Sequence, residues 1–120
     1  MSEEKKVVIL VRAAPYGMAS AGEGFRAIIG LAGMGIETHA VLAEDGVLVA
    51  IKGQNPDALA MHKLEDAYSQ VPEFGAKLYV HTPSLDERGL LKADCIGVEY
   101  VDDDELRDLI SSADHVITFN

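Results

Sequence analysis

The most restrictive feature of this sequence is a set of short apolar runs that lack the polar alternation of a half-buried strand. The first is Val7-Val8-Ile9-Leu10-Val11, and β-branched runs of this kind are typical of strands covered on both faces, as in parallel sheets. Residues 77–81 and 115–119 have a similar character. Segments with helical spacing separate the runs, and this alternation favours a parallel sheet with helices on both faces. We therefore predict an α/β fold with about five mostly parallel strands.

The chain is expected to form one domain over residues 1–120, because it contains no linker, internal repeat or low-complexity segment. Residues 47–52 are compatible with a strand or a short helix. We favour the helix, since Gly53-Gln54-Asn55-Pro56 follows immediately and leaves no partner strand nearby. The expected strands are 7–11, 36–42, 77–81, 96–101 and 115–119, the last of them buried, and the expected helices are 19–34, 47–52, 56–70, 85–91 (a short helix or turn) and 102–112.

Charge and cysteine content exclude several classes of function. The 120 residues carry a formal net charge of −10, so the chain lacks the basic face that nucleic acids or anionic membranes require. No stretch approaches the ~20 apolar residues of a membrane span, and the N-terminal run is too short for a signal-peptide core. The one cysteine, Cys95, excludes an intrachain disulfide and Cys-x-x-Cys chemistry. We expect a cytoplasmic protein.

Candidate binding residues follow the predicted strands. In open α/β sheets, ligands bind beyond the carboxyl ends of the strands. Arg88 offers a planar donor fork that suits an anion such as sulfite or a persulfide terminus, although it could equally pair with a nearby acid such as Asp86 or with a helix end. The candidate binding residues in these loops are Tyr16, Asp45, His81, Ser84 and Arg88.

Other kinds of site find little support. The loop after the first strand matches neither the dinucleotide-binding fingerprint nor the P-loop, so we expect no nucleotide and no cofactor. The four histidines are scattered singly, which predicts no metal site. Ser84, His81 and Asp86 lie too close in one loop for a hydrolytic triad. Cys95 is compatible with a small buried thiol or with a reactive one, and it is the candidate catalytic residue.

Several local strings occur together in one known family. The strings are Ala14-Pro15-Tyr16-Gly17, Glu44-Asp45-Gly46-Val47, Lys52-Gly53-Gln54-Asn55-Pro56, Ser84-Leu85-x-x-Arg88-Gly89-Leu90, Gly97-Val98-Glu99 and Ser112-Ala113-Asp114-x-Val116-Ile117-Thr118-Phe119. Each string is weak alone, but their common order is specific. Over nearly its whole length the chain resembles the DsrE/DsrF-like family, in particular its small YchN-like and TusC/DsrF-like members.

This resemblance implies a three-layer α/β/α sandwich, oligomers, and a role in sulfur relay. In relay members a cysteine carries a persulfide and passes it to the next protein. The matching position here is His81, and a second cysteine of some members falls near Ser84. Because imidazole cannot hold a persulfide, the resemblance implies a partner or structural subunit that works with other sulfur-transfer proteins.

Two further readings stay open. One is a homo-oligomer that binds a small molecule or anion near His81 and performs no sulfur chemistry. The other keeps Cys95 as a relocated thiol carrier. Whether the chain is an enzyme is left open. Large apolar side chains exceed what one thin core needs and, with the resemblance, predict a homo-oligomer, a trimer or a hexamer; they are Phe25, Met34, Met61, Tyr68, Phe74 and Tyr79.

Overall fold

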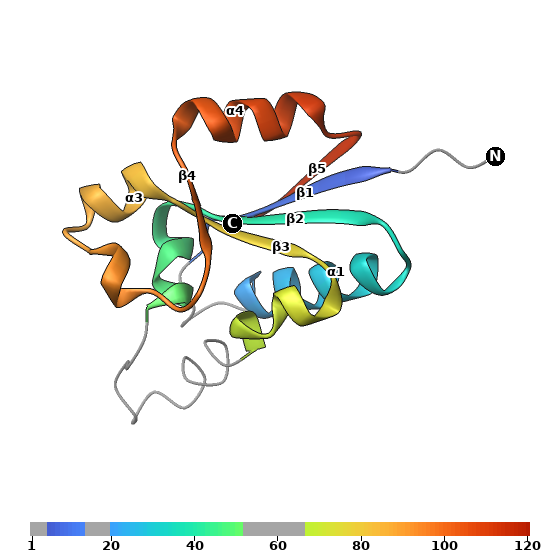
Figure 1. Ribbon diagram of the computed structural model, residues 1–120, viewed down its shortest axis with the longest axis horizontal. Coiled ribbons are helices and arrows are strands. Elements are labelled where there is room, and N and C mark those ends of the chain that lie inside the picture. Colours follow the sequence, from blue (N-terminus) through green and yellow to red (C-terminus); the bar gives the residue numbers. More distant parts are fainter. Residues whose placement is uncertain (1–4, 14–19, 52–66) are drawn as a thin grey trace.

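A computed structural model of the chain describes residues 5–13, 20–51 and 67–120. Its centre is a sheet of five strands in the order β4-β3-β2-β1-β5, and every pair of neighbours is parallel (Figure 1). The predicted α/β fold with about five parallel strands is confirmed. The strands are β1 (Lys6–Val11), β2 (Glu37–Leu42), β3 (Lys77–His81), β4 (Glu99–Val101) and β5 (His115–Phe119).

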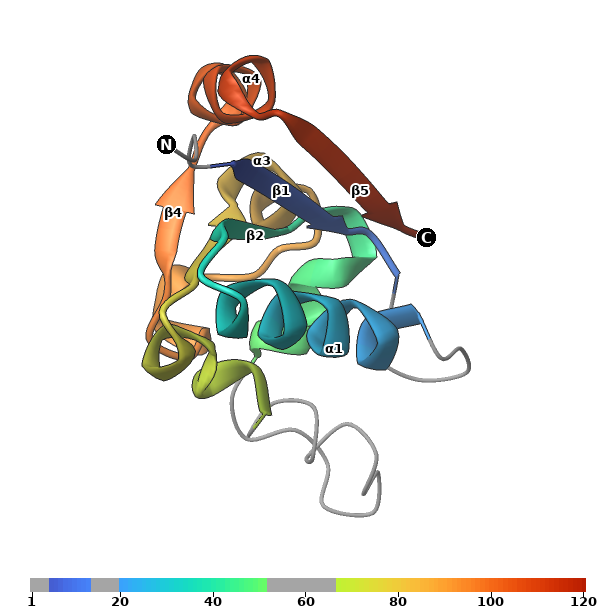
Figure 2. The ribbon, with the colours of Figure 1, turned by 90° about the vertical axis from the view of Figure 1, so that its right-hand side faces the viewer.

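Helices cover both faces of the sheet, which gives the expected three layers (Figures 1 and 2). On one face lie α1 (Ser20–Gly33) and the 3-10 helices η1 (Glu44–Ala50) and η2 (Val71–Phe74). Their apolar residues close the main core with Ile9, Val11 and Leu42. On the other face, α4 (Asp103–Ser112) packs Leu106 and Leu109 over a smaller cluster. Alternate residues of β1, β2, β3 and β4 therefore serve the two cores.

Two short helices lie at the carboxyl ends of the strands and differ from the sequence prediction. α3 (Thr82–Glu87) begins directly after β3, because Pro83 is tolerated in a first helical turn; the prediction placed this helix later, over residues 85–91. η1 begins at Glu44, so the segment expected to be a turn before residue 47 is already helical. η3 (Lys92–Asp94) precedes β4, which is shorter than the predicted 96–101. Most of the predicted helix over residues 56–70 lies outside the described residues.

Gly46 explains how η1 fits against the sheet. A Cβ atom built on Gly46 would lie 2.0 Å from the carbonyl oxygen of Val11. The backbone of η1 therefore touches the end of β1, and the N–H of Ala43 donates to the same Val11 oxygen at 3.0 Å. Only glycine allows this approach, which fixes the position of Glu44 and Asp45 beside it.

β5 is not the buried strand that its composition suggests. It pairs with β1 alone and forms one border of the sheet. Val116 is 41% exposed and Ile117 is 39% exposed, and their side chains lie on opposite faces because they are neighbours along a strand. Both faces of this border are therefore partly open to solvent.

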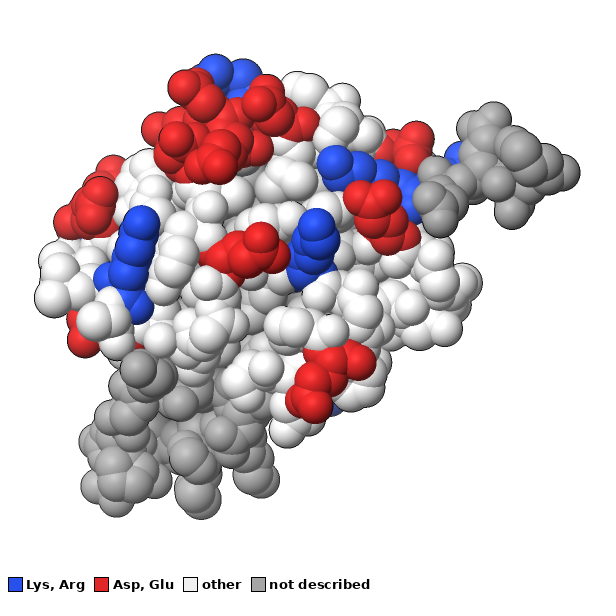
Figure 3. Space-filling model, viewed as in Figure 1, with Lys and Arg blue, Asp and Glu red and all other residues white. Residues whose placement is uncertain are grey.

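Acidic side chains gather over α4, as the space-filling view shows (Figure 3). Asp103, Asp104 and Glu105 form its first turn, where carboxylates favour the positive end of the helix. Asp102 caps the helix by accepting from the N–H of Glu105 at 2.8 Å. Within the described part of the chain, no helix is long and apolar enough to cross a membrane.

Candidate functional site

The carboxyl ends of β2 and β3, η1, α3 and the start of α4 meet at one edge of the sheet. This edge carries four of the five predicted binding residues: Asp45, His81, Ser84 and Arg88. The fifth, Tyr16, lies outside the described residues. The rule that ligands bind beyond the carboxyl ends of parallel strands therefore selected side chains that lie together in the fold. Their role in binding stays a prediction.

His81 is the centre of a hydrogen-bonded chain. Its Nδ1 lies 2.7 Å from Oγ of Ser84, and its Nε2 lies 2.6 Å from Oδ1 of Asp103. Oγ of Ser84 also accepts from the backbone N–H of Glu44 at 2.8 Å. With neutral His81, the Ser84 hydroxyl donates to Nδ1 and Nε2–H donates to Asp103.

The contacts from Ser84 to His81 and from His81 to Asp103 have the arrangement of a hydrolytic Ser-His-Asp triad. Asp103, not Asp86, is the carboxylate in this arrangement. Yet Ser84 is only 1% exposed, and its oxygen already accepts from Glu44 and contacts His81. A substrate carbon cannot reach such a hydroxyl. Ser84 therefore orients His81 and holds η1 against α3.

Arg88 is engaged within the protein. Its Nη2 donates to Oδ1 of Asp45 at 3.0 Å and its Nη1 to the carbonyl of Ser84 at 3.2 Å. Nη1 also lies 3.6 Å from the carboxylate of Glu87. These contacts correspond to the second sequence interpretation, in which Arg88 pairs with nearby acids, with Asp45 in place of Asp86. An incoming anion would have to displace Asp45 or Glu87, which disfavours a simple anion site here.

Glu44 joins this edge to the end of β1. Its carboxylate pairs with Arg12. The hydrogen bond and charge of Arg12, with a smaller effect of Arg88, hold the pKa of the Glu44 carboxyl below its ordinary value. Glu44 also has a φ of 52°, a left-handed conformation that costs about 1 kcal/mol in a residue with a side chain. The surrounding contacts impose this backbone shape at the candidate site.

Cys95 lies apart from the hydrogen-bonded chain around His81. It is 6% exposed and belongs to the main core. An isolated antiparallel bridge pairs it with Ile51, and Sγ lies 3.9 Å from the carbonyl oxygen of Leu91. The environment is that of a packed thiol, since a reactive cysteine needs access and a positive neighbourhood.

The predicted binding residues omit three residues of the site. Asp103 contacts His81 and the backbone of Glu44 contacts Ser84, while Arg12 contacts Glu44. The strand-end rule selects the loop that contains Glu44, and Arg12 directly follows the run at residues 7–11, so this rule points to both. Asp103 was not selected because an acidic residue in the first turn of a helix is already explained by the positive end of that helix. Over the residues that the structure describes, no group of three or more His, Cys, Asp or Glu could hold a metal ion.

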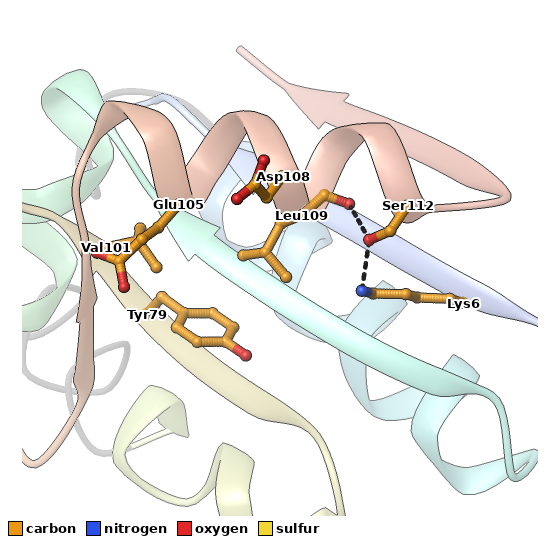
Figure 4. Close-up of a pocket in the computed structure, with 7 residues that line it drawn as sticks. All are labelled: Lys6, Tyr79, Val101, Glu105, Asp108, Leu109 and Ser112. Atoms are coloured by element: carbon orange, nitrogen blue, oxygen red, sulfur yellow. Dashed lines mark hydrogen bonds between the residues drawn. The ribbon is translucent and has the colours of Figure 1, made fainter.

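A hollow of about 300 Å³ lies between α4 and the sheet (Figure 4). None of the predicted site residues lines it. Tyr79 and Leu109 provide apolar surface, and Nζ of Lys6 contacts Oγ of Ser112 at 2.6 Å. Because it is open and shares no residue with the chain around His81, we do not assign it to the same site.

Beside this hollow, Tyr79 begins a second hydrogen-bonded chain. Its hydroxyl lies 2.9 Å from Nδ1 of the buried His39, whose Nε2 contacts Glu37 at 2.6 Å. Burial, with smaller effects of Glu99 and Glu37, raises the pKa of Tyr79. The hydrogen bond from His39 lowers the pKa of Glu37. Tyr79 therefore stays protonated at neutral pH and satisfies the buried imidazole.

Comparison with known proteins adds the family context. The model of the DsrE/DsrF-like family matches residues 5–119. A TusC homolog of Pseudomonas aeruginosa is 32% identical over 116 residues, which are 95% of this chain and 98% of that protein. The intracellular sulfur oxidation protein DsrF of Allochromatium vinosum is 27% identical over 99 residues, 82% of this chain and 73% of DsrF.

The fold also matches a solved structure. The crystal structure of the YchN protein from E. coli aligns with a TM-score of 0.79 and 27% sequence identity, covering 96% of this chain and 99% of YchN. The similarity of fold therefore extends over nearly the whole chain.

Proposed function

Because this chain belongs to the DsrE/DsrF-like family, we propose that it acts in intracellular sulfur transfer or sulfur oxidation as a partner or structural subunit rather than as the sulfur carrier. Relatives named TusC and DsrF support the association with sulfur chemistry. The partners are other sulfur-transfer proteins, whose thiols would carry the sulfur.

The observation that carries this proposal is the chain from Ser84 through His81 to Asp103. The family resemblance places the relay cysteine at position 81, and an imidazole there cannot form a persulfide. It can contact a sulfur-bearing group of a partner if that group replaces Asp103 at Nε2. The Asp103 side chain is exposed, whereas that of His81 is only 13% exposed, so a docked protein would approach the imidazole from the Asp103 side.

The burial of Cys95 also supports the proposal that a partner protein, and not this chain, carries the sulfur. A carrier thiol has to reach both its donor and its acceptor, whereas Cys95 is enclosed in the main core. The alternative of a plain anion-binding protein has less support, because the Arg88 donors contact Asp45, Glu87 and the Ser84 carbonyl.

Intact-protein mass spectrometry tests the absence of a carrier thiol. The folded protein is mixed with inorganic polysulfide, with Cys95→Ser as the control and urea-unfolded wild type as the reactive reference. We expect no sulfur adduct on the folded protein and one added sulfur on the unfolded chain, lost in Cys95→Ser. Rapid addition to Cys95 in the folded protein would instead support the relocated carrier.

We further infer that one domain over residues 1–120 assembles into a homo-oligomer, a trimer or a hexamer. Met34, Leu91 and Phe74 are large apolar residues exposed in the single chain, and burying such groups favours association. Light scattering should give a particle mass that is a multiple of 12.9 kDa. Particles of one chain only, at micromolar concentration, would contradict this inference.

We propose the cytoplasm as the location. The name of the Allochromatium relative describes it as intracellular, and a chain with one cysteine does not depend on an intrachain disulfide. Cell fractionation followed by immunodetection should find the protein with cytoplasmic markers. Recovery with periplasmic markers would refute this location.

A further inference from the structure

The two borders of the sheet are built differently. β4 has three residues, includes Glu99 and is followed by Asp102, Asp103 and Asp104. Short length and charge are the usual protection of an edge against pairing with another strand. The β5 border has five residues, His115–Phe119, with no Asp, Glu, Lys, Arg, Pro or Gly. It therefore lacks the protection that β4 has.

The backbone of β5 offers an unused set of donors and acceptors. The N–H of Arg12 donates to the carbonyl of Phe119 at 2.8 Å, so Phe119 faces β1. In a strand, successive residues direct their backbone groups to opposite sides. Ile117 consequently faces β1 as well, and Val116 and Thr118 direct their N–H and C=O groups away from the sheet.

These observations point to a second copy of the chain as the occupant. We propose that β5 pairs antiparallel with β5 of a second copy about a two-fold axis at Ile117. This inference rests on the proposed self-association and not on the sulfur proposal. It names the surface of contact, and a contact of this symmetry belongs to a dimer or hexamer, not to an isolated trimer.

The symmetry satisfies the exposed groups of β5. With the axis at Ile117, Val116 of each copy lies opposite Thr118 of the other and exchanges two hydrogen bonds with it, about four in all. Ile117 lies opposite its own counterpart, and His115 opposite Phe119 of the second copy. Each of these pairs joins uncharged aromatic or β-branched residues, which are favourable cross-strand neighbours.

Charge also directs the copies to this border. Each chain carries a net charge of −10, so two copies repel each other, and the acids over α4 concentrate that charge (Figure 3). Within a few ångströms, desolvating carboxylates would add to the cost of contact. The strand from His115 to Phe119 contributes no formal charge, and its exposed Val116 and Ile117 gain from burial.

Cross-linking tests the position of the axis. In a Cys95→Ser background, Ile117→Cys places one thiol on the axis, where opposed Cα atoms of a non-hydrogen-bonded pair lie about 4.5 Å apart, within disulfide range. We expect a disulfide-linked dimer under mild oxidation in dilute solution. Glu99→Cys, exposed on β4 at the opposite border of the sheet, is the control and should stay monomeric on a non-reducing gel. Equal cross-linking of the two variants would overturn the proposal.

A second pair of variants tests the hydrogen bonds. Thr118→Pro removes an outward N–H while keeping the bonds between β5 and β1, and edge strands tolerate proline. Thr118→Lys adds an edge charge and guards against misfolding of the proline variant. Both should reduce the particle mass at least two-fold, whereas Glu99→Lys, on the opposite border, should leave it unchanged. An unchanged oligomer in both Thr118 variants overturns the β5 contact and leaves self-association standing; a monomeric wild type overturns both.

Discussion

Gly46→Ala provides the sharpest test of how the candidate site is positioned. The new methyl group would lie 2.0 Å from the carbonyl oxygen of Val11, and 2.8 Å from its carbonyl carbon. Non-bonded heavy atoms keep about 3.5 Å apart, so η1 or the end of β1 has to move by more than about 1 Å. The groups that would have to move are backbone atoms of η1 or of β1. Because β1 is hydrogen-bonded to β2 and β5 on its two sides, its displacement is costly.

The expected cost follows from two contributions. Overpacking of this kind destabilises a fold by about 1–3 kcal/mol. The displacement also strains the hydrogen bond from Ala43 to Val11, worth about 1 kcal/mol. We expect a loss of about 2–4 kcal/mol in the free energy of unfolding, or roughly 8–16 °C in Tm for a chain of this size.

Urea and thermal unfolding of three proteins check this estimate. Gly30 is exposed in α1, and a Cβ added there meets nothing within 4 Å. Gly30→Ala should therefore stabilise the chain by about 0.5–1 kcal/mol through helix propensity. Wild type should unfold between the two variants. If Gly46→Ala is as stable as wild type, η1 is not held tightly against β1 and our account of the site geometry is wrong.

Two other predictions concern the same edge. Ser84→Ala removes the acceptor of the Glu44 N–H and the partner of His81 and should cost about 1–3 kcal/mol in urea unfolding, whereas the exposed control Ser111→Ala should cost almost nothing. Because the pKa of Glu44 is lower in the folded state than its ordinary value of 4.5, its ionisation stabilises the fold above that value and this contribution disappears as pH falls through the folded pKa. The stability advantage of wild type over Glu44→Gln should therefore shrink between about pH 6 and about pH 3; an advantage that is constant over this range would refute the assigned role of Arg12.

Most strands were predictable because continuous runs of apolar, β-branched residues indicate strands that are buried on both faces. The run at residues 7–11 became β1, an interior strand between β2 and β5, and Lys77–His81 was correct to the residue. The misjudged strand, β5, has the same β-branched character but lies at a border. A strand's composition does not show whether it lies inside the sheet or at a border. The position of a strand depends on the crossover connections between strands, which no local sequence pattern reports.

The site was predictable in part for a similar reason. Parallel strands bring their carboxyl ends to one edge, which selected His81, Ser84 and Asp45. The contact between His81 and Asp103 joins residues 22 positions apart, and no local pattern reports it. Cys95 had two interpretations in the sequence, and its burial in the main core supports the structural one.

The central claim is that His81 recognises a sulfur-bearing group that the chain itself does not carry. NMR spectra of the imidazole groups in Cys95→Ser, titrated with glutathione persulfide, test it directly because no transfer to Cys95 can occur. The account predicts saturable shifts for His81, none for His115 at the distant start of β5, and smaller shifts with ordinary glutathione. Unchanged His81 resonances, or equal shifts for both histidines, would contradict it.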